Sequence, residues 1–176
     1  MSNLFAQALP FTVLLSHIVL VIVFLSIVFR KSWGREVTHW VGKNAVSLGL
    51  LVAVVAVGGS LFYSNIIGFP PCVLCWWQRI ALYPMIVLFA VAFFKKHDRG
   101  VFSYAVPLAT FAGILALYHS YVYWGGTSIL PCTALGGACS KIYVYAFGYI
   151  TIPTMSLTIA LFILLLAWSN KIYQSR

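Results

Sequence analysis

The chain consists of long apolar runs separated by short polar segments. Apolar runs lie at about 9–29, 44–66, 77–94, 101–123 and 150–169. A bilayer core about 30 Å thick requires roughly 20 apolar residues in a helix, so each run is long enough to span it. The pattern therefore predicts an all-α membrane protein with five transmembrane helices.

Composition supports a lipid environment and excludes most enzyme classes. Hydrophobic residues make up 62% of the 176 positions and charged residues 7%, a balance atypical of water-soluble domains. The only acids are Glu36 and Asp98, so the chain lacks the paired carboxylates of glycosidases. It also lacks a phosphate-binding loop, a dinucleotide fingerprint and an HExxH motif.

The positive charge indicates orientation in the membrane. A net charge of +9 would suggest nucleic-acid binding in a soluble protein. Of the 11 basic residues, only Arg79 and Lys141 fall on one side of the predicted spans. The others share the opposite side, at positions 30, 31, 35, 43, 95, 96, 99, 171 and 176. The positive-inside rule then places the N-terminus outside and the C-terminus in the cytoplasm, with no nucleic-acid partner.

The first apolar run is expected to remain as a helix. It has no basic residue before it, unlike a secretion signal, and Arg30 and Lys31 follow it directly.

Four cysteines form two close pairs on the predicted outer side. Cys72 and Cys75 precede the third run, and Cys132 and Cys139 lie between the fourth and fifth. The outer compartment of bacteria is oxidising, so thiols there persist as disulfides unless something reduces them. The even count fits two disulfide bridges.

The first pair has the spacing of a redox site. The sequence Cys72-Val-Leu-Cys75 stands at a predicted helix entrance, where the helix dipole and free N–H groups stabilise a thiolate. Arg79 follows Cys75 by one helical turn and can share its face. The alternative is that Arg79 only extends toward the outer lipid headgroups.

The second pair lies in a segment rich in small residues. Gly136 and Gly137 separate Cys132 from Cys139 and favour a mobile loop, which suits a thiol that must meet another protein. One alternative is a static disulfide staple. Another is a zinc site made by all four cysteines, although an oxidising surface argues against it.

Among the histidines, His119 is the candidate for function. It ends the fourth predicted helix at the depth of Arg79, where an imidazole could transfer protons or simply pack. His17, His39 and His97 are assigned to packing or solvation.

These residues resemble the disulfide bond formation protein B family, DsbB, and particularly its Gram-positive BdbC branch. The resemblance covers about 44–170 and rests on CVLC at 72–75 with Arg79, on Tyr118-His119, on Cys132 and Cys139, and on GYITIP at 148–153. It implies a four-helix transmembrane bundle at 44–170. Residues 1–43 then form an additional N-terminal transmembrane helix with a basic cytoplasmic loop, and 171–176 a cytoplasmic tail.

The resemblance also implies a function. Such a protein reoxidises a thioredoxin-fold thiol oxidase of DsbA/BdbD type outside the bacterial cytoplasmic membrane and passes the electrons to ubiquinone or menaquinone. The implied disulfides are Cys72–Cys75 and Cys132–Cys139, and no metal is implied. The partner would attack Cys132 and release Cys139, Cys75 would contact the quinone, and Arg79 and His119 would lie close to it.

Two features depart from the best-known bacterial members, and two other functions compete. The span at 9–29 is additional, and only six residues separate Cys132 from Cys139. A protein similar to vitamin K epoxide reductase would carry its loop pair before the CxxC, which is the reverse of the order here. A non-enzymatic membrane protein would use its cysteines only as structural disulfides.

Overall fold

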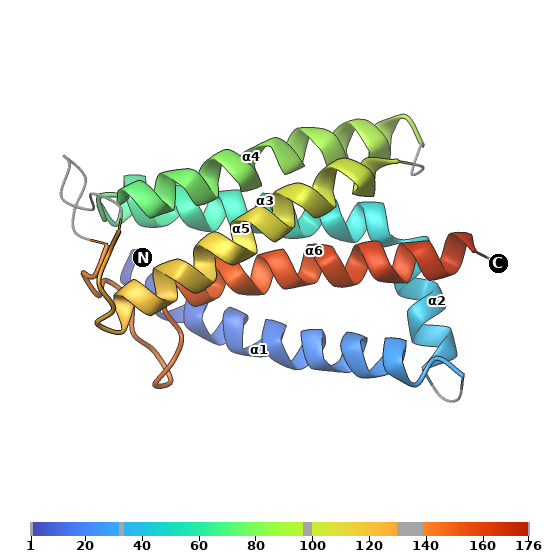
Figure 1. Cartoon of the computed structure of the whole chain (residues 1–176), viewed down its shortest axis with the longest axis horizontal. Helices are drawn as coiled ribbons and strands as arrows, with labels where there is room; N and C mark the ends of the chain where they lie inside the picture. The colour runs from blue at the N-terminus through green and yellow to red at the C-terminus, as the bar shows by residue number, and fades with distance from the viewer. Residues whose placement is uncertain (1, 32–33, 97–99, 130–138, 176) are drawn as a thin grey trace.

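A computed structural model describes residues 2–31, 34–96, 100–129 and 139–175, with side chains from residue 9 onward. These residues fold into helices and connecting segments, with one isolated β-bridge between Ala146 and Ile150. The helices are α1 (Ser2–Val28), α2 (Arg35–Lys43), α3 (Ala45–Leu61), the π-helical η1 (Phe62–Ile66), α4 (Val73–Phe94), α5 (Val101–Tyr123) and α6 (Ile152–Gln174). The predicted all-α class is confirmed (Figure 1).

Five helical stretches are long and apolar enough to cross a membrane, as the hydropathy pattern predicts. They are Leu9–Val28, Ala45–Ile66, Val73–Phe94, Val101–Tyr123 and Ile152–Gln174. The third begins at residue 73 and not at 77. Pro70 and Pro71 precede the N-cap residue Cys72, and the helix starts at the next residue, Val73. The CxxC is therefore part of the first helical turn.

The last four spans form a bundle, and α1 lies beside it. Helix α4 packs against α3 and α5, and α6 packs against α3 and α5. Helix α1 contacts α6 and α2, and runs along one side of α6 in Figure 1. The two ends of the chain lie at opposite ends of the molecule in the same view. This arrangement follows from an odd number of spans.

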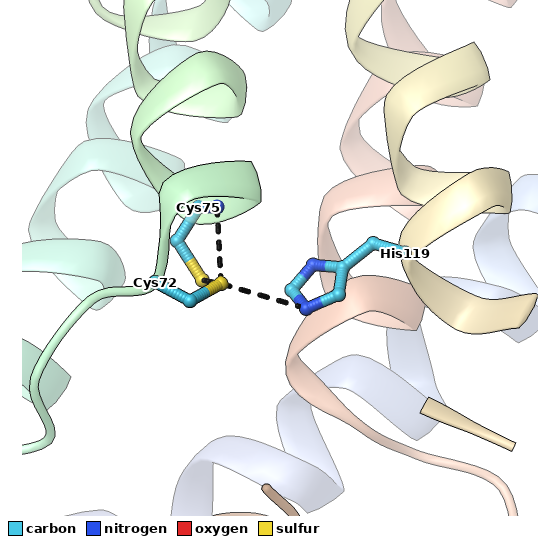
Figure 2. Close-up of side chains that lie close together, drawn as sticks. All are labelled: Cys72, Cys75 and His119. Atoms are coloured by element: carbon cyan, nitrogen blue, oxygen red, sulfur yellow. Dashed lines mark hydrogen bonds between the residues drawn. The ribbon is translucent and has the colours of Figure 1, made fainter. Parts of the chain in front are cut away.

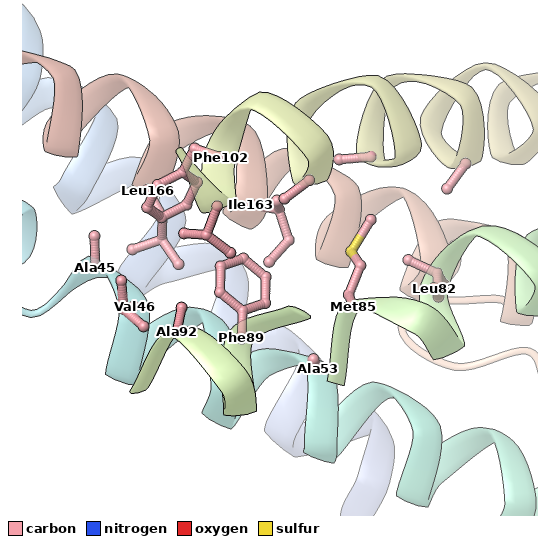
Figure 3. Close-up of a cluster of buried hydrophobic side chains, with 14 of the residues drawn as sticks. Ala45, Val46, Ala53, Leu82, Met85, Phe89, Ala92, Phe102, Ile163 and Leu166 are labelled. Atoms are coloured by element: carbon pink, nitrogen blue, oxygen red, sulfur yellow. The ribbon is translucent and has the colours of Figure 1, made fainter. Parts of the chain in front are cut away.

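Small residues allow the helices of the bundle to approach closely. A Cβ added to Gly113 of α5 would lie 3.4 Å from the Cβ of Ala160 in α6. In α3, Gly49 lies under the buried ring of Phe89 from α4, and Figure 3 shows this ring at the centre of the apolar cluster. Within lipid, such close packing drives helix association in place of the hydrophobic effect.

Helix α2 occupies the segment expected to be a basic loop. The Thr38 hydroxyl of α2 donates to the Ser26 carbonyl of α1 at 2.9 Å. The backbone carbonyl of Thr38 accepts a hydrogen bond from Ser169 Oγ of α6 at 2.8 Å. Asn170 Nδ2 donates to the Gly42 carbonyl at 3.1 Å. These bonds tie α1, α2 and α6 together at the end of the bundle opposite the CxxC.

Candidate redox site and adjoining cavity

The entrance of α4 positions the two cysteines of the CxxC. Cys72 is the N-cap residue, in an extended conformation, and its Sγ accepts the backbone N–H of Cys75 at 3.3 Å. A helix N-terminus carries a partial positive charge and unsatisfied N–H groups. The sequence Pro-Pro-Cys thus folds so that the first sulfur lies in a field that stabilises a thiolate.

The two sulfurs are adjacent and the first is buried. Cys72 Sγ and Cys75 Sγ lie 2.9 Å apart and are not bonded, so the structure shows the dithiol form. Donation from the Cys75 thiol is the main cause that lowers the pKa of Cys72, and donation and charge from His119 add to it against the opposing effect of burial. In the dithiol form the negative charge therefore belongs to Cys72. The predicted disulfide and the predicted quinone contact of Cys75 remain predictions.

His119 belongs to the same cluster, as Figure 2 shows. The ring is buried on α5, with Nε2 3.7 Å from Cys72 Sγ. Its Nδ1 lies 3.3 Å from the side-chain amide nitrogen of Gln78. When that amide donates to Nδ1, the ring proton is on Nε2 and faces the sulfur. Gln78, a buried amide one turn beyond Cys75, is a residue that the sequence analysis missed.

Arg79 lies on the neighbouring face of α4 and is half-buried. Its Nε donates to Ser60 Oγ at 3.0 Å and its Nη2 donates to the Ser60 carbonyl at 3.1 Å. The guanidinium carbon lies 5.2 Å from the ring centre of Trp76. Of the two acids in the sequence, Glu36 lies in α2 at the opposite end of the molecule and Asp98 lies outside the described residues. No carboxylate therefore balances this charge among the described residues at the CxxC end.

A cavity of about 340 Å³ connects these groups, a size within the usual range for small-molecule sites. Helices α1, α3, α4 and α6 supply most of its lining, and Cys72, Cys75, Arg79 and His119 border it. Among the described residues, three buried hydroxyls find no hydrogen-bond partner, and all three residues line this cavity: Tyr63, Tyr143 and Ser156. An orphaned buried hydroxyl is costly, so this set suits a ligand that accepts hydrogen bonds.

The structure describes one member of the second cysteine pair. Cys139 is disulfide-bonded, buried, and packs in one cluster with Cys72, Leu74 and Val122. Cys132, the predicted partner, lies outside the described residues. Cys139 and the CxxC are thus close together, as the relay implied by the resemblance requires.

The cluster also has the atoms to hold a soft cation. The ligand atoms of Cys72, Cys75 and His119 all lie within 4.8 Å of one another. These are three ligands, whereas structural zinc sites use four. Cys139 offers no thiolate in this structure, because it is disulfide-bonded.

The other two described histidines make contacts elsewhere. His17 bonds to Thr158 and Tyr149, and His39 contacts the ring of Tyr173 edge-on at 4.9 Å. His97 lies outside the described residues.

Comparison with known proteins gives the family. The model of the family "Disulfide bond formation protein DsbB" matches residues 42–169, a segment that includes the CxxC, Arg79, His119 and Cys139. The chain belongs to the DsbB family. No solved structure matches it.

Relatives of this DsbB-family chain carry matching names. A probable disulfide formation protein of Metapseudomonas resinovorans is 37% identical over 116 residues, which are 65% of this chain and 80% of the relative. Disulfide bond formation protein C of Bacillus subtilis is 38% identical over 109 residues, 61% of this chain and 78% of the relative. Probable disulfide formation protein C 2 of Bacillus anthracis is 31% identical over 134 residues, 76% of this chain and 95% of the relative. The chain is thus a multi-pass membrane protein of disulfide bond formation.

Proposed function

We propose that this protein is a thiol:quinone oxidoreductase of the bacterial cytoplasmic membrane. It reoxidises an extracytoplasmic thioredoxin-fold thiol oxidase of DsbA/BdbD type and passes the electrons to quinone. The observation that carries the proposal is one largely apolar cavity bordered by the CxxC, His119 and Arg79. Arg79 has no acidic partner among the described residues.

The lining of the cavity fits a quinone. A quinone has an apolar ring and two carbonyl oxygens that accept hydrogen bonds. The guanidinium of Arg79 is a donor at the cavity wall, and the unpartnered hydroxyls of Tyr63 and Ser156 belong to residues that line it. In a medium of low dielectric constant, Arg79 stabilises the negative charge that develops on a quinone oxygen during reduction. Ser60 holds the guanidinium in place for this role.

The proposed reaction balances within this site. Oxidation of the Cys72 thiolate and the Cys75 thiol forms one S–S bond and releases two electrons and one proton. These, together with the proton that Cys72 gave up when it ionised, convert the quinone into a quinol. The field at the N-terminus of α4 and the Nε2–H of His119 hold Cys72 as the thiolate that this chemistry requires. Gln78 fixes the orientation of the ring.

The second pair would connect the site to the partner. The partner's thiolate attacks Cys132 and breaks its bond to Cys139. Formation of the partner's disulfide then leaves Cys132 and Cys139 as thiols, which reduce the Cys72–Cys75 disulfide. Packing of Cys139 beside Cys72 supports a direct exchange. Oxidases of DsbA type have potentials near about −120 mV, so the relay needs a strong final acceptor such as quinone.

The test is quinone-dependent oxidation of a reduced DsbA-type oxidase by the detergent-solubilised protein. We expect one quinol for each disulfide formed, complete loss of quinone reduction in Cys75→Ser, and a strong decrease in Arg79→Ala. Thr110→Ala, on an exposed face of α5, is the control and should retain the rate. Quinone reduction that survives Cys75→Ser would reject the proposal. So would cysteine variants that only lower stability, as the staple alternative expects.

A further inference from the structure

Helix α1 borders the cavity although it lies outside the matched family segment of 42–169. Four of its residues line the cavity wall: Leu9, Thr12, Val13 and Ser16. Their spacing of three, four and seven positions places them on one face of the helix. The side chains of Leu15, Ile18 and Val19 are exposed and would face lipid.

Specific bonds fix α1 in this position. The His17 ring lies between α6 and the segment before it, with Nε2 2.7 Å from Thr158 Oγ1 and Nδ1 3.1 Å from the Tyr149 hydroxyl. At the other end of α1, Ser26 is fully buried and its carbonyl accepts the Thr38 hydroxyl. Polar contacts between helices hold their register within a bilayer. The face at 9–16 is therefore held against the cavity.

Much of the remaining cavity wall is apolar. Helix α3 contributes Leu51, Val52 and Val55, and α6 contributes Ile159 and Phe162. Cys75 and Arg79 border the cavity at the redox site, and smaller polar side chains, among them Thr12 and Ser16 of α1 and Ser156 and Thr158 of α6, also line it. A ligand that fits must combine a hydrogen-bonding head with an apolar extension, which is the chemistry of a prenylated quinone.

We propose that α1 is a wall of the quinone cavity and contacts the apolar part of the bound quinone, so that its face at 9–16 determines quinone affinity. This inference rests on the proposed function. It assigns to the additional helix a binding role beyond anchoring the chain in the membrane.

A matched pair of substitutions tests whether the face of α1 at 9–16 contacts the quinone. Val13→Phe adds a ring on the cavity face, whereas Val19→Phe adds the same ring on the exposed face of the same helix. Overfilling a packed site costs about 1–3 kcal/mol, so Val13→Phe should weaken quinone binding about tenfold. Val19→Phe should leave binding within about twofold of the wild type, because its ring faces lipid. Binding is measured by equilibrium dialysis of a short-chain prenylated quinone with the detergent-solubilised protein, alongside thermal unfolding.

Contact between α1 and the bound quinone can be detected without measuring quinone affinity. A quinone that carries a photoreactive group on its prenyl chain should label the peptide containing residues 9–16 in membrane vesicles, and excess unlabelled quinone should suppress the label.

If Val13→Phe unfolds the protein, the smaller change Ser16→Val replaces it, with the same expectation. Equal binding by both phenylalanine variants, or label on α3 and α6 alone, overturns the inference. Label that excess phospholipid suppresses but quinone does not would assign the wall to a lipid acyl chain and also overturn it.

The outcomes separate the inference from the proposed function. Suppose that quinone reduction depends on the cysteines but that Val13→Phe and Val19→Phe both bind quinone as the wild type does. This result rejects only the role of α1 in quinone binding. Quinone binding that responds to Val13→Phe, without cysteine-dependent reduction, rejects the proposed function alone. Absence of quinone binding by the wild type rejects both.

Discussion

At the scale of single residues, the acidity of Cys72 is the property with the clearest consequence. Three donors approach its sulfur: the Cys75 thiol, the Cys75 backbone N–H and His119 Nε2. They hold the pKa of Cys72 below the ordinary value for a thiol, of about 8.5. Because the unfolded chain binds more protons between the two pKa values, stability of the dithiol form should decrease as pH falls through that window.

Thiolate absorbance in the ultraviolet should therefore persist below the ordinary thiol pKa in the dithiol form. Cys75→Ala removes the largest single cause and His119→Ala removes two further causes, so both should raise the apparent pKa of Cys72. A pH titration of each variant, with the second pair kept oxidised, measures these shifts. An unchanged titration in Cys75→Ala would contradict donation from the Cys75 thiol, and a low-pKa thiolate that persists in Cys72→Ala would contradict the assignment of the charge to Cys72.

The unpartnered hydroxyls give a second prediction at this scale. If Ser156 and Tyr63 donate only to a ligand, Ser156→Ala and Tyr63→Phe should leave the ligand-free protein equally or more stable, since a buried hydroxyl without a partner is unfavourable. Each should weaken quinone binding about fivefold, the effect of losing a hydrogen bond of about 1 kcal/mol. Dialysis and thermal unfolding measure the two effects. Ser120→Ala, whose hydroxyl already donates to Ala116, is the control for binding.

The sequence could predict some of these residues because they carry distinctive chemistry in a short motif. The CxxC, Arg79 and His119 are unusual in an apolar chain, and the structure places them around one cavity. Ser60 and Gln78 could not be predicted, because serine and glutamine are common and their roles depend on how α3 and α4 are rotated against their neighbours. The same applies to Tyr63 and Ser156.

At the scale of elements, hydropathy predicts the number of spans better than their limits. Hydropathy reports which residues favour an apolar environment, whereas the start of α4 depends on Pro71 and on the N-cap at Cys72. Helix α2 was missed because a short segment with several charges has no apolar run. Its buried residues Thr38, Val41 and Gly42 share one face, and packing against α1 and α6 stabilises it.

Two glycines of α3 allow a matched test of helix packing. A Cβ at Gly49 would lie 2.7 Å from the ring of Phe89, whereas a Cβ at Gly58 would meet no atom within 4 Å. Gly49→Ala should lower the free energy of unfolding by about 1–3 kcal/mol through overpacking. Gly58→Ala should raise it by up to about 1 kcal/mol, because alanine favours the helix. Unfolding in mixed detergent micelles measures both, and equal effects would contradict close contact between α3 and α4 at Phe89.

At the scale of the whole molecule, chemistry and charge separate along the bundle axis. The CxxC at the start of α4 lies at one end, and α2 with its basic residues lies at the other (Figure 1). Helix α5 has 23 residues, and a rise of 1.5 Å per residue gives about 35 Å, enough to cross the hydrocarbon core. The two ends therefore belong to different compartments. The positive-inside rule predicts that the basic end faces the cytoplasm and the CxxC faces the oxidising side.

This orientation can be measured with single cysteines in a chain whose four native cysteines are changed to serine. Thr127 follows α5 at the redox end and Ser175 follows α6 at the other, and both are exposed. A membrane-impermeant maleimide should label Thr127→Cys in intact spheroplasts and Ser175→Cys only after the membrane is opened. Because thiols in the cytoplasm are kept reduced, a disulfide-forming relay requires the cysteines outside. The reverse labelling pattern would place the CxxC in a reducing compartment and contradict both the orientation and the proposed partner.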